Sequence, residues 1–124
     1  LHVTQEGCFY TCRKMLKTQF KKDSNAWQRH DDNCSWILET NPKFEKPSNW
    51  NSIVHSCVAA IKAVGLDIGA CDVRVQNETT NKGGKRGEVD FIIVEINSAP
   101  SFGSITSQKY IEQLPKILKS KFVN

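Results

Sequence analysis

An apolar stripe at helical spacing within residues 49–64 constrains the fold of this chain more than any other feature. Apolar side chains recur there every three or four positions, namely Trp50, Ile53, Val54, Cys57, Val58, Ile61 and Val64. This spacing places them on one face of an α-helix, and such a face needs another element to cover it. Pro47 and Ser48 are start signals, and Gly65 stands where a C-terminal cap belongs. We therefore predict a helix over 49–64 that packs on the rest of the fold.

Two strand-like segments follow this helix, GACDVRVQ at 69–76 and VDFIIVEIN at 89–97. The polar, Gly-rich segment between them is typical of a hairpin loop, so we expect the two strands to be antiparallel neighbours. Residues 91–94 are apolar without alternation, which predicts a strand buried on both faces.

The N-terminal segment 1–16 favours a second hairpin. The strand-like LHVT is followed by a turn at Gly7, and then by CFYTCRKML as the returning strand. Strict alternation along the returning strand predicts two faces, one with Cys8, Tyr10 and Cys12 and the other with Phe9, Thr11 and Arg13.

The rest of the chain divides into a polar segment and a C-terminal helix. Residues 17–48 are polar and long, which is typical of a functional loop, with a short strand at 35–38. A helix is expected from about Thr106, with a kink or a break at Pro115. Its expected buried side consists of Tyr110, Ile111, Leu114, Ile117, Leu118 and Phe122.

Composition limits the class of protein. The chain has 124 residues, 39% hydrophobic and 24% charged, which suits one α+β domain, a mainly antiparallel sheet with flanking helices. No apolar run approaches the ~18 residues of a membrane span, so we expect no membrane partner. The net charge of +4 does not by itself indicate nucleic acid. Five cysteines, an odd number, favour reduced thiols and a cytoplasmic location.

Three oxygen-bearing side chains are candidates for a metal site. Asp72 lies in the first of the two adjacent strands, and Glu95 and Asn97 lie two positions apart near the end of the second. Alternation places Glu95 and Asn97 on one face. Carboxylate and amide oxygens suit Mg²⁺ or Mn²⁺. The other interpretation is that Asp72 and Glu95 are solvated strand residues that never meet.

Four segments carry a resemblance to a known family. They are CRK at 12–14, RHDDNCSW at 29–36, VGLDIGACDV at 64–73 and VEINSAPSFG at 94–103. Together they resemble the C-terminal part of the ATP-grasp fold, as in carboxylate–amine ligases and in ATP-grasp proteins often found in phage genomes. Ser101 stands where that family usually has glycine, and RHDDN has one extra aspartate.

The resemblance implies an ATP-dependent carboxylate–amine ligase that works through an acylphosphate. It implies that residues 1–124 are the C-terminal ATP-grasp subdomain of a longer chain, with the nucleotide-clamping lysines upstream. ATP and an unidentified carboxylate and amine would be the substrates. Asp72, Glu95 and Asn97 would hold the Mg²⁺ or Mn²⁺ ions that bridge the ATP phosphates.

The resemblance also implies roles for three basic residues. Arg13 would lie over the transferred phosphate or the acyl oxygen, as a catalytic residue. Arg29 and His30 would bind the substrate carboxylate or the phosphates. Without the resemblance, Arg13 is equally well interpreted as a solvated strand arginine, and His30 as an exposed loop histidine.

Other interpretations stay open. An inactive ATP-grasp half-domain, or one part of a two-chain enzyme, fits the same motifs, and a homo-oligomer is also left open. The basic segment 13–22, with its aromatic neighbours, suits a nucleic-acid-binding module, although that does not explain the acidic cluster. A structural zinc site is a further alternative, with ligands at Cys8, Cys12, His30 and Cys34. Against the zinc site, Cys8 and Cys12 would be ~13 Å apart on an extended strand.

Overall fold

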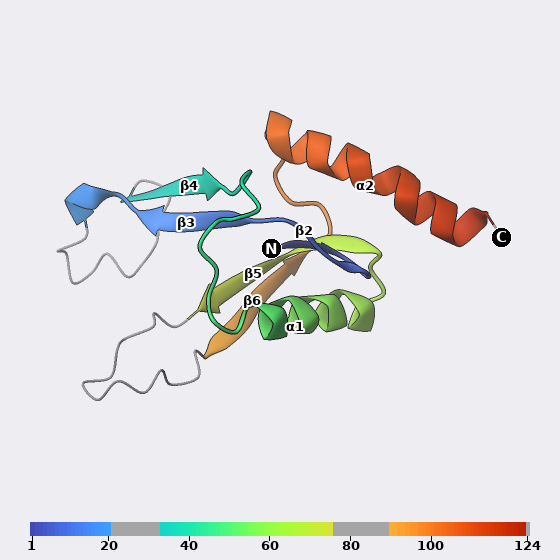
Figure 1. Ribbon diagram of the computed structural model, residues 1–124, viewed down its shortest axis with the longest axis horizontal. Coiled ribbons are helices and arrows are strands. Elements are labelled where there is room, and N and C mark those ends of the chain that lie inside the picture. Colours follow the sequence, from blue (N-terminus) through green and yellow to red (C-terminus); the bar gives the residue numbers. More distant parts are fainter. Residues whose placement is uncertain (21–32, 76–89, 124) are drawn as a thin grey trace. The chain divides into compact units, whose positions relative to one another are not determined.

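The computed structural model describes residues 1–20, 33–75 and 90–123. The chain forms two compact units, which Figure 1 colours by sequence. The four-stranded unit consists of Leu1–Tyr10 and Glu45–Asn124, and the two-stranded unit consists of Thr11–Phe44. The described part of the chain is α+β, with antiparallel strands and two α-helices, as the sequence predicts.

The four-stranded unit is built on a single antiparallel sheet. Its strands are β1 (His2–Thr4), β2 (Gly7–Tyr10), β5 (Ile68–Val75) and β6 (Phe91–Asn97), in the order β2-β1-β5-β6. The turn of the predicted N-terminal hairpin ends at Gly7, whose φ of 153° is positive and therefore suits glycine. The predicted antiparallel pairing of β5 with β6 is confirmed.

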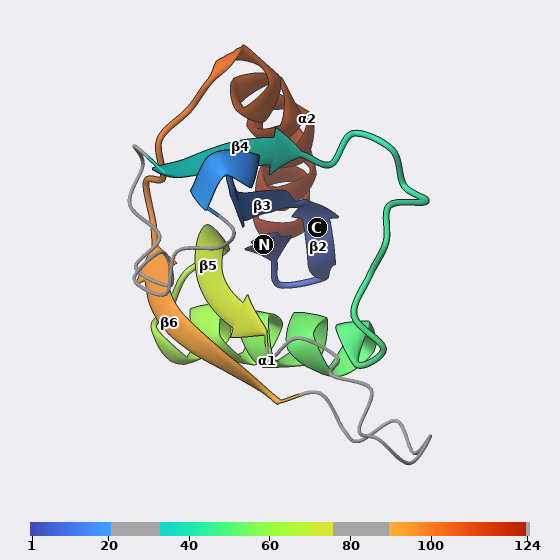
Figure 2. The ribbon, with the colours of Figure 1, turned by 90° about the vertical axis from the view of Figure 1, so that its left-hand side faces the viewer.

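Helix α1 (Trp50–Ala63) covers one face of this sheet, as Figures 1 and 2 show. The predicted apolar stripe is confirmed at its centre and fails at its end, because Val64 is 58% exposed. The fully buried core between helix and sheet consists of Val3, Ile53, Cys57, Ile61 and Cys71. The Cys57 thiol hydrogen-bonds the Cys71 side chain, which together with burial raises the pKa of Cys57.

The C-terminal end of α1 confirms the predicted glycine cap. Gly65 has a φ of 74°, in the left-handed region. Its N–H donates to the carbonyl of Lys62 at 3.0 Å, and the N–H of Leu66 donates to the carbonyl of Ile61 at 2.9 Å. These two bonds form a Schellman motif, which satisfies carbonyl groups that the helix end would otherwise leave open.

A β-bulge shifts the pleat of β6. Cα partners run Asp72↔Glu95 and then Val73↔Ile93, so Val94 is an extra residue on β6. Phe91, Ile93 and Ile96 all pack against the core as a result. The predicted burial of both faces of β6 is wrong, since Ile92 is 63% exposed and Val94 is 58% exposed. Helix α1 covers only one of the two faces.

A second bulge shifts β2 in the same way. Cα partners run His2↔Tyr10 and then Val3↔Cys8, so Phe9 is the extra residue. Cys8 packs against the α1 core, whereas the ring centroids of Phe9 and Tyr10 lie 6.3 and 5.1 Å from that of His2. The prediction of one face for Cys8 and Tyr10 is therefore wrong, because it assumed an unbroken alternation.

Helix α2 (Ser104–Phe122) is one continuous helix with Pro115 inside it, so of the predicted kink or break the break is wrong. It begins near the predicted position, and its first half packs through Tyr110, whose hydroxyl lies 2.9 Å from His2 Nδ1. The predicted buried side is confirmed only at Tyr110. Four apolar residues of the predicted stripe are exposed instead, namely Ile111, Leu114, Leu118 and Phe122. No helix in the described ranges is long and apolar enough to cross a membrane.

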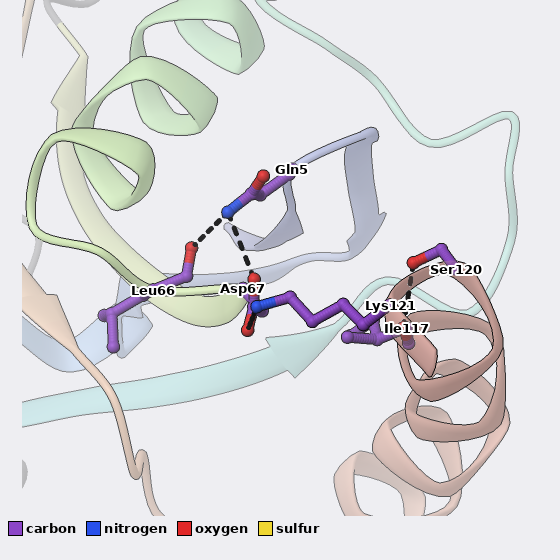
Figure 3. Close-up of polar contacts among 6 residues, drawn as sticks. All are labelled: Gln5, Leu66, Asp67, Ile117, Ser120 and Lys121. Carbon is purple, nitrogen blue, oxygen red and sulfur yellow. Dashed lines mark hydrogen bonds and ion pairs between the residues drawn. The ribbon is translucent and has the colours of Figure 1, made fainter. Parts of the chain in front are cut away.

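Asp67, just before β5, contacts the turn between β1 and β2 and also helix α2 (Figure 3). Its carboxylate accepts a hydrogen bond from Gln5 Nε2 at 3.2 Å and pairs with Lys121 Nζ of α2 at 2.6 Å. The same Gln5 nitrogen also donates to the carbonyl of Leu66 at 3.1 Å. Helix α2 is thus joined to the rest of the unit at two points, by Tyr110 in its first half and by Lys121 in its last turn.

The two-stranded unit pairs β3 (Cys12–Leu16) with β4 (Cys34–Leu38), and a short 3₁₀ turn, η1 (Thr18–Phe20), follows β3. The short strand predicted at 35–38 is confirmed. The predicted continuous strand from Cys8 to Leu16 is wrong, because Thr11 interrupts it and β3 joins a different sheet from β2.

Candidate functional site

Asp72 and Glu95 are direct cross-strand partners in the β5–β6 pair. Directly opposed residues of antiparallel strands have Cβ atoms about 5 Å apart and point to the same face. Both residues are exposed, and their sequence neighbours Cys71 and Ile96 pack on the α1 side. The two carboxylates therefore lie together on the face opposite to α1.

Asn97 lies on the same face as Glu95. It is paired with Ala70, and the register between Glu95 and Asn97 is regular, so the two side chains are about 7 Å apart along the strand. Asn97 also has a constrained backbone. A Cβ on Gly69 would lie 3.1 Å from the Asn97 carbonyl oxygen, which is tighter than most real contacts. Gly69 thus lets β5 and β6 approach each other closely at Asn97.

The donor set of this cluster suits a hard divalent cation. It offers two carboxylates and one carboxamide, whose oxygens Mg²⁺ and Mn²⁺ accept together with water. Among the described residues, no three His, Cys, Asp or Glu side chains are grouped closely enough to hold a metal ion. A cation here would therefore need Asn97, water or phosphate oxygens besides Asp72 and Glu95.

Arg13 lies in the two-stranded unit and forms an ion pair through Nε with Glu39 Oε1. Its side chain is 39% exposed, whereas that of Glu39 is only 8% exposed. Arg13 is therefore a partly exposed strand arginine whose guanidinium is held by a nearly buried carboxylate. Glu39 in turn is positioned by the strand pairing, since its N–H donates to the carbonyl of Thr11 at 3.0 Å.

Two predicted site residues cannot be placed. Arg29 and His30 both lie outside the described residues. The alternative interpretation as a zinc site also involves His30, but two of its other ligands, Cys12 and Cys34, are separated. The register of β3 with β4 pairs Cys12 with Leu38 and Leu16 with Cys34, so Cys12 and Cys34 lie at opposite ends of this strand pair. All five cysteines are within the described residues and are free thiols.

Two charged residues near the candidate residues were missed by the sequence reasoning. Arg74 is two positions beyond Asp72 on β5 and is exposed on the same face, which alternation alone would have found. Glu39, the partner of Arg13, was hidden because the pairing of β3 with β4 was not predicted. No known family model, curated protein or solved structure matches this chain.

Proposed function

We propose that this chain supplies the metal-binding and phosphate-binding side of an ATP-dependent carboxylate–amine ligase of the ATP-grasp type. The observation that carries the proposal is the register of β5 with β6. It pairs the exposed residues Asp72 and Glu95 and leaves half-buried Asn97 on the same face. Three oxygen-bearing side chains that the sequence motifs single out separately are thus neighbours.

In this proposal, Asp72, Glu95 and Asn97 hold Mg²⁺ or Mn²⁺ on the open face of the sheet. When bound, the cation supplies positive charge against the β- and γ-phosphates of ATP, which favours phosphoryl transfer to a carboxylate. The carboxylate of Glu95 would supply negative charge and oxygen ligands to the bound cation. Gly69 supports the arrangement indirectly, because its missing side chain leaves room for the Asn97 backbone.

Arg13 is proposed to meet the transferred phosphoryl group or the acyl oxygen. Its Nε is engaged by Glu39, so the two terminal nitrogen atoms of the guanidinium would donate to the substrate. A planar fork of this kind fits two oxygens of one phosphoryl or carboxylate group, and a lysine cannot replace it. Glu39 is then a positioning residue, which fixes the orientation of the guanidinium.

The metal site is tested first with the 124-residue chain itself. Addition of Mn²⁺ should broaden the amide NMR signals of residues near Asp72, Glu95 and Asn97 before those of the rest of the chain. Glu95→Gln should abolish this selective broadening, because a neutral amide does not offset the charge of the ion. Glu112→Gln is the matched control, since it removes an exposed carboxylate on α2. Equal broadening in wild type and Glu95→Gln would contradict the metal assignment.

The ligase activity is tested by ADP formation in an enzyme that contains this chain, at saturating Mg²⁺. Glu95→Gln should abolish ADP formation, and Arg13→Lys should lose most of it, in both cases with an unchanged fold by circular dichroism. Full activity of Glu95→Gln would refute the proposal. Selective Mn²⁺ binding without ADP formation in any wild-type assembly would instead indicate an inactive half-domain.

A further inference from the structure

Two thiols that the proposed function does not use lie side by side in the core of the four-stranded unit. Neither the Cys57 nor the Cys71 side chain has any exposed surface. The Cys71 thiol donates to the carbonyl oxygen of Cys57, with Sγ and oxygen 3.8 Å apart. Helix α1 and strand β5 therefore meet through two sulfur-bearing side chains that are 14 positions apart in the chain.

We propose that Cys57 and Cys71 are a redox pair, which hydrogen peroxide converts to a reversible disulfide that joins α1 to β5. The inference rests on the packing of these two side chains and is independent of the proposed function. The two thiols are neighbours in the packed core. If one of them is oxidised to a sulfenic acid, the second thiol is therefore in position to attack it.

The reaction needs only a small oxidant and balances with peroxide alone. One thiol gives up its proton and its sulfur attacks a peroxide oxygen, which yields a sulfenic acid and one water. The second thiol then displaces the sulfenic hydroxyl group as a second water, and the S–S bond forms. Two electrons pass from the two sulfurs to the peroxide. A dithiol such as dithiothreitol reverses the change by exchange.

A hollow beside α1 offers the oxidant an approach to this pair. It has a volume of about 360 Å³, and Cys8, Val54 and Val58 are among the residues that line it. Val58 follows Cys57 directly in α1, and half-buried Cys8 packs against the same core as Cys57. Cys8 is also the thiol that would compete for Cys57.

The test oxidises the folded 124-residue chain with hydrogen peroxide and alkylates the remaining thiols after denaturation. The expected result is a loss of two hydrogens, three of the five thiols open to alkylation, and one linked peptide pair that contains Cys57 and Cys71. Dithiothreitol should restore all five. The oxidised protein should also unfold at a higher urea concentration, because the bond closes a loop in the unfolded chain.

Variants and a control identify the pair. Cys57→Ser and Cys71→Ser should each abolish the linked peptide, whereas Cys34→Ser, a buried cysteine of the other unit, should leave it intact. Oxidation in urea should give mixed pairings, which shows that the fold selects the pair. The proposal is overturned if the folded wild type keeps five alkylatable thiols, or if Cys57 is found linked to Cys8. Both of these outcomes are measured on the wild-type protein, so they do not depend on whether a variant folds.

Discussion

On the α1 side of the four-stranded sheet, five side chains are fully buried, whereas on the opposite side the same strands present exposed carboxylates. The change from a buried to an exposed side chain occurs between two adjacent residues of β5. Cys71 has no exposed surface and its neighbour Asp72 is exposed. One end of the opposite side is covered by α2, where His2 and Phe9 pack against Tyr110.

This difference separates, within a single strand, the residues that folding requires from those of the proposed metal site. Residues that face α1 are chosen for volume and shape, because removing them leaves a cavity. Residues on the open side are free of that constraint and can be charged. The expected consequence is that substitutions on the two sides act on different quantities: stability on one, ligand binding on the other.

The largest contrast is expected between two isoleucines. Ile61→Ala should lower the free energy of unfolding by about 2–5 kcal/mol, because Ile61 is fully buried against the sheet. Ile92→Ala is the matched control on the opposite side and should change it by less than about 0.5 kcal/mol, since Ile92 is 63% exposed. Urea unfolding followed by circular dichroism measures both. Equal losses of unfolding free energy in the two variants would show that the two sides of the sheet contribute equally to stability.

A second, smaller effect concerns His2, at the covered end of the open side. Burial, with a lesser contribution from the amino-terminal charge, lowers the pKa of His2 from 6.5 to about 4. The unfolded chain therefore binds more protons between these values, so stability is present above pH 6.5 and falls as the pH approaches 4. We expect a loss of about 3 kcal/mol over this range from His2.

The measurement for His2 is urea unfolding at a series of pH values from 7.5 to 4. His2→Gln should reduce the pH dependence over this window relative to wild type, while the carboxylates common to both proteins contribute equally. The same pH dependence in the two proteins would show that His2 titrates normally and that α2 does not shield it from water.

The smallest expected effect is at Asp72. Asp72→Asn should leave stability unchanged or raise it by roughly 0.2–1 kcal/mol without metal, because it removes one of two like charges placed directly opposite each other. The gain should shrink in high salt, which screens exposed charges. Urea unfolding at two salt concentrations measures this. A clear loss of stability would make Asp72 a structural residue and would weaken its assignment as a metal ligand.

Helix α1, its glycine cap and the pairing of β5 with β6 could be predicted because each depends on local signals. The stripe from Ile53 to Ile61 and the positive φ of Gly65 are properties of adjacent residues. The exposure of α2 could not be predicted in this way. An apolar stripe indicates a helix face that can be covered, but tertiary structure decides whether an element covers it.

The candidate site was predictable as a set of residues but not as an arrangement. The motif around Asp72 and the Glu-x-Asn motif single out the side chains, whereas their common face depends on the bulge at Val94. The ion pair of Arg13 with Glu39 was missed for a related reason. It depends on the pairing of β3 with β4, which brings together two side chains that lie 26 positions apart in the chain.

The extra residue Val94 makes the length of β6 as informative as its composition. Counted in steps of two from Phe91 and Ile93, Glu95 would fall among the core residues. The bulge changes this parity, so that Ile96 enters the core instead. Any change of side chain alters β6 at one point only. The gain or loss of a single residue in β6 would move every later side chain of the strand to the opposite face of the sheet. We therefore expect relatives of this chain to conserve the number of residues in β6 more strictly than the identities of those residues.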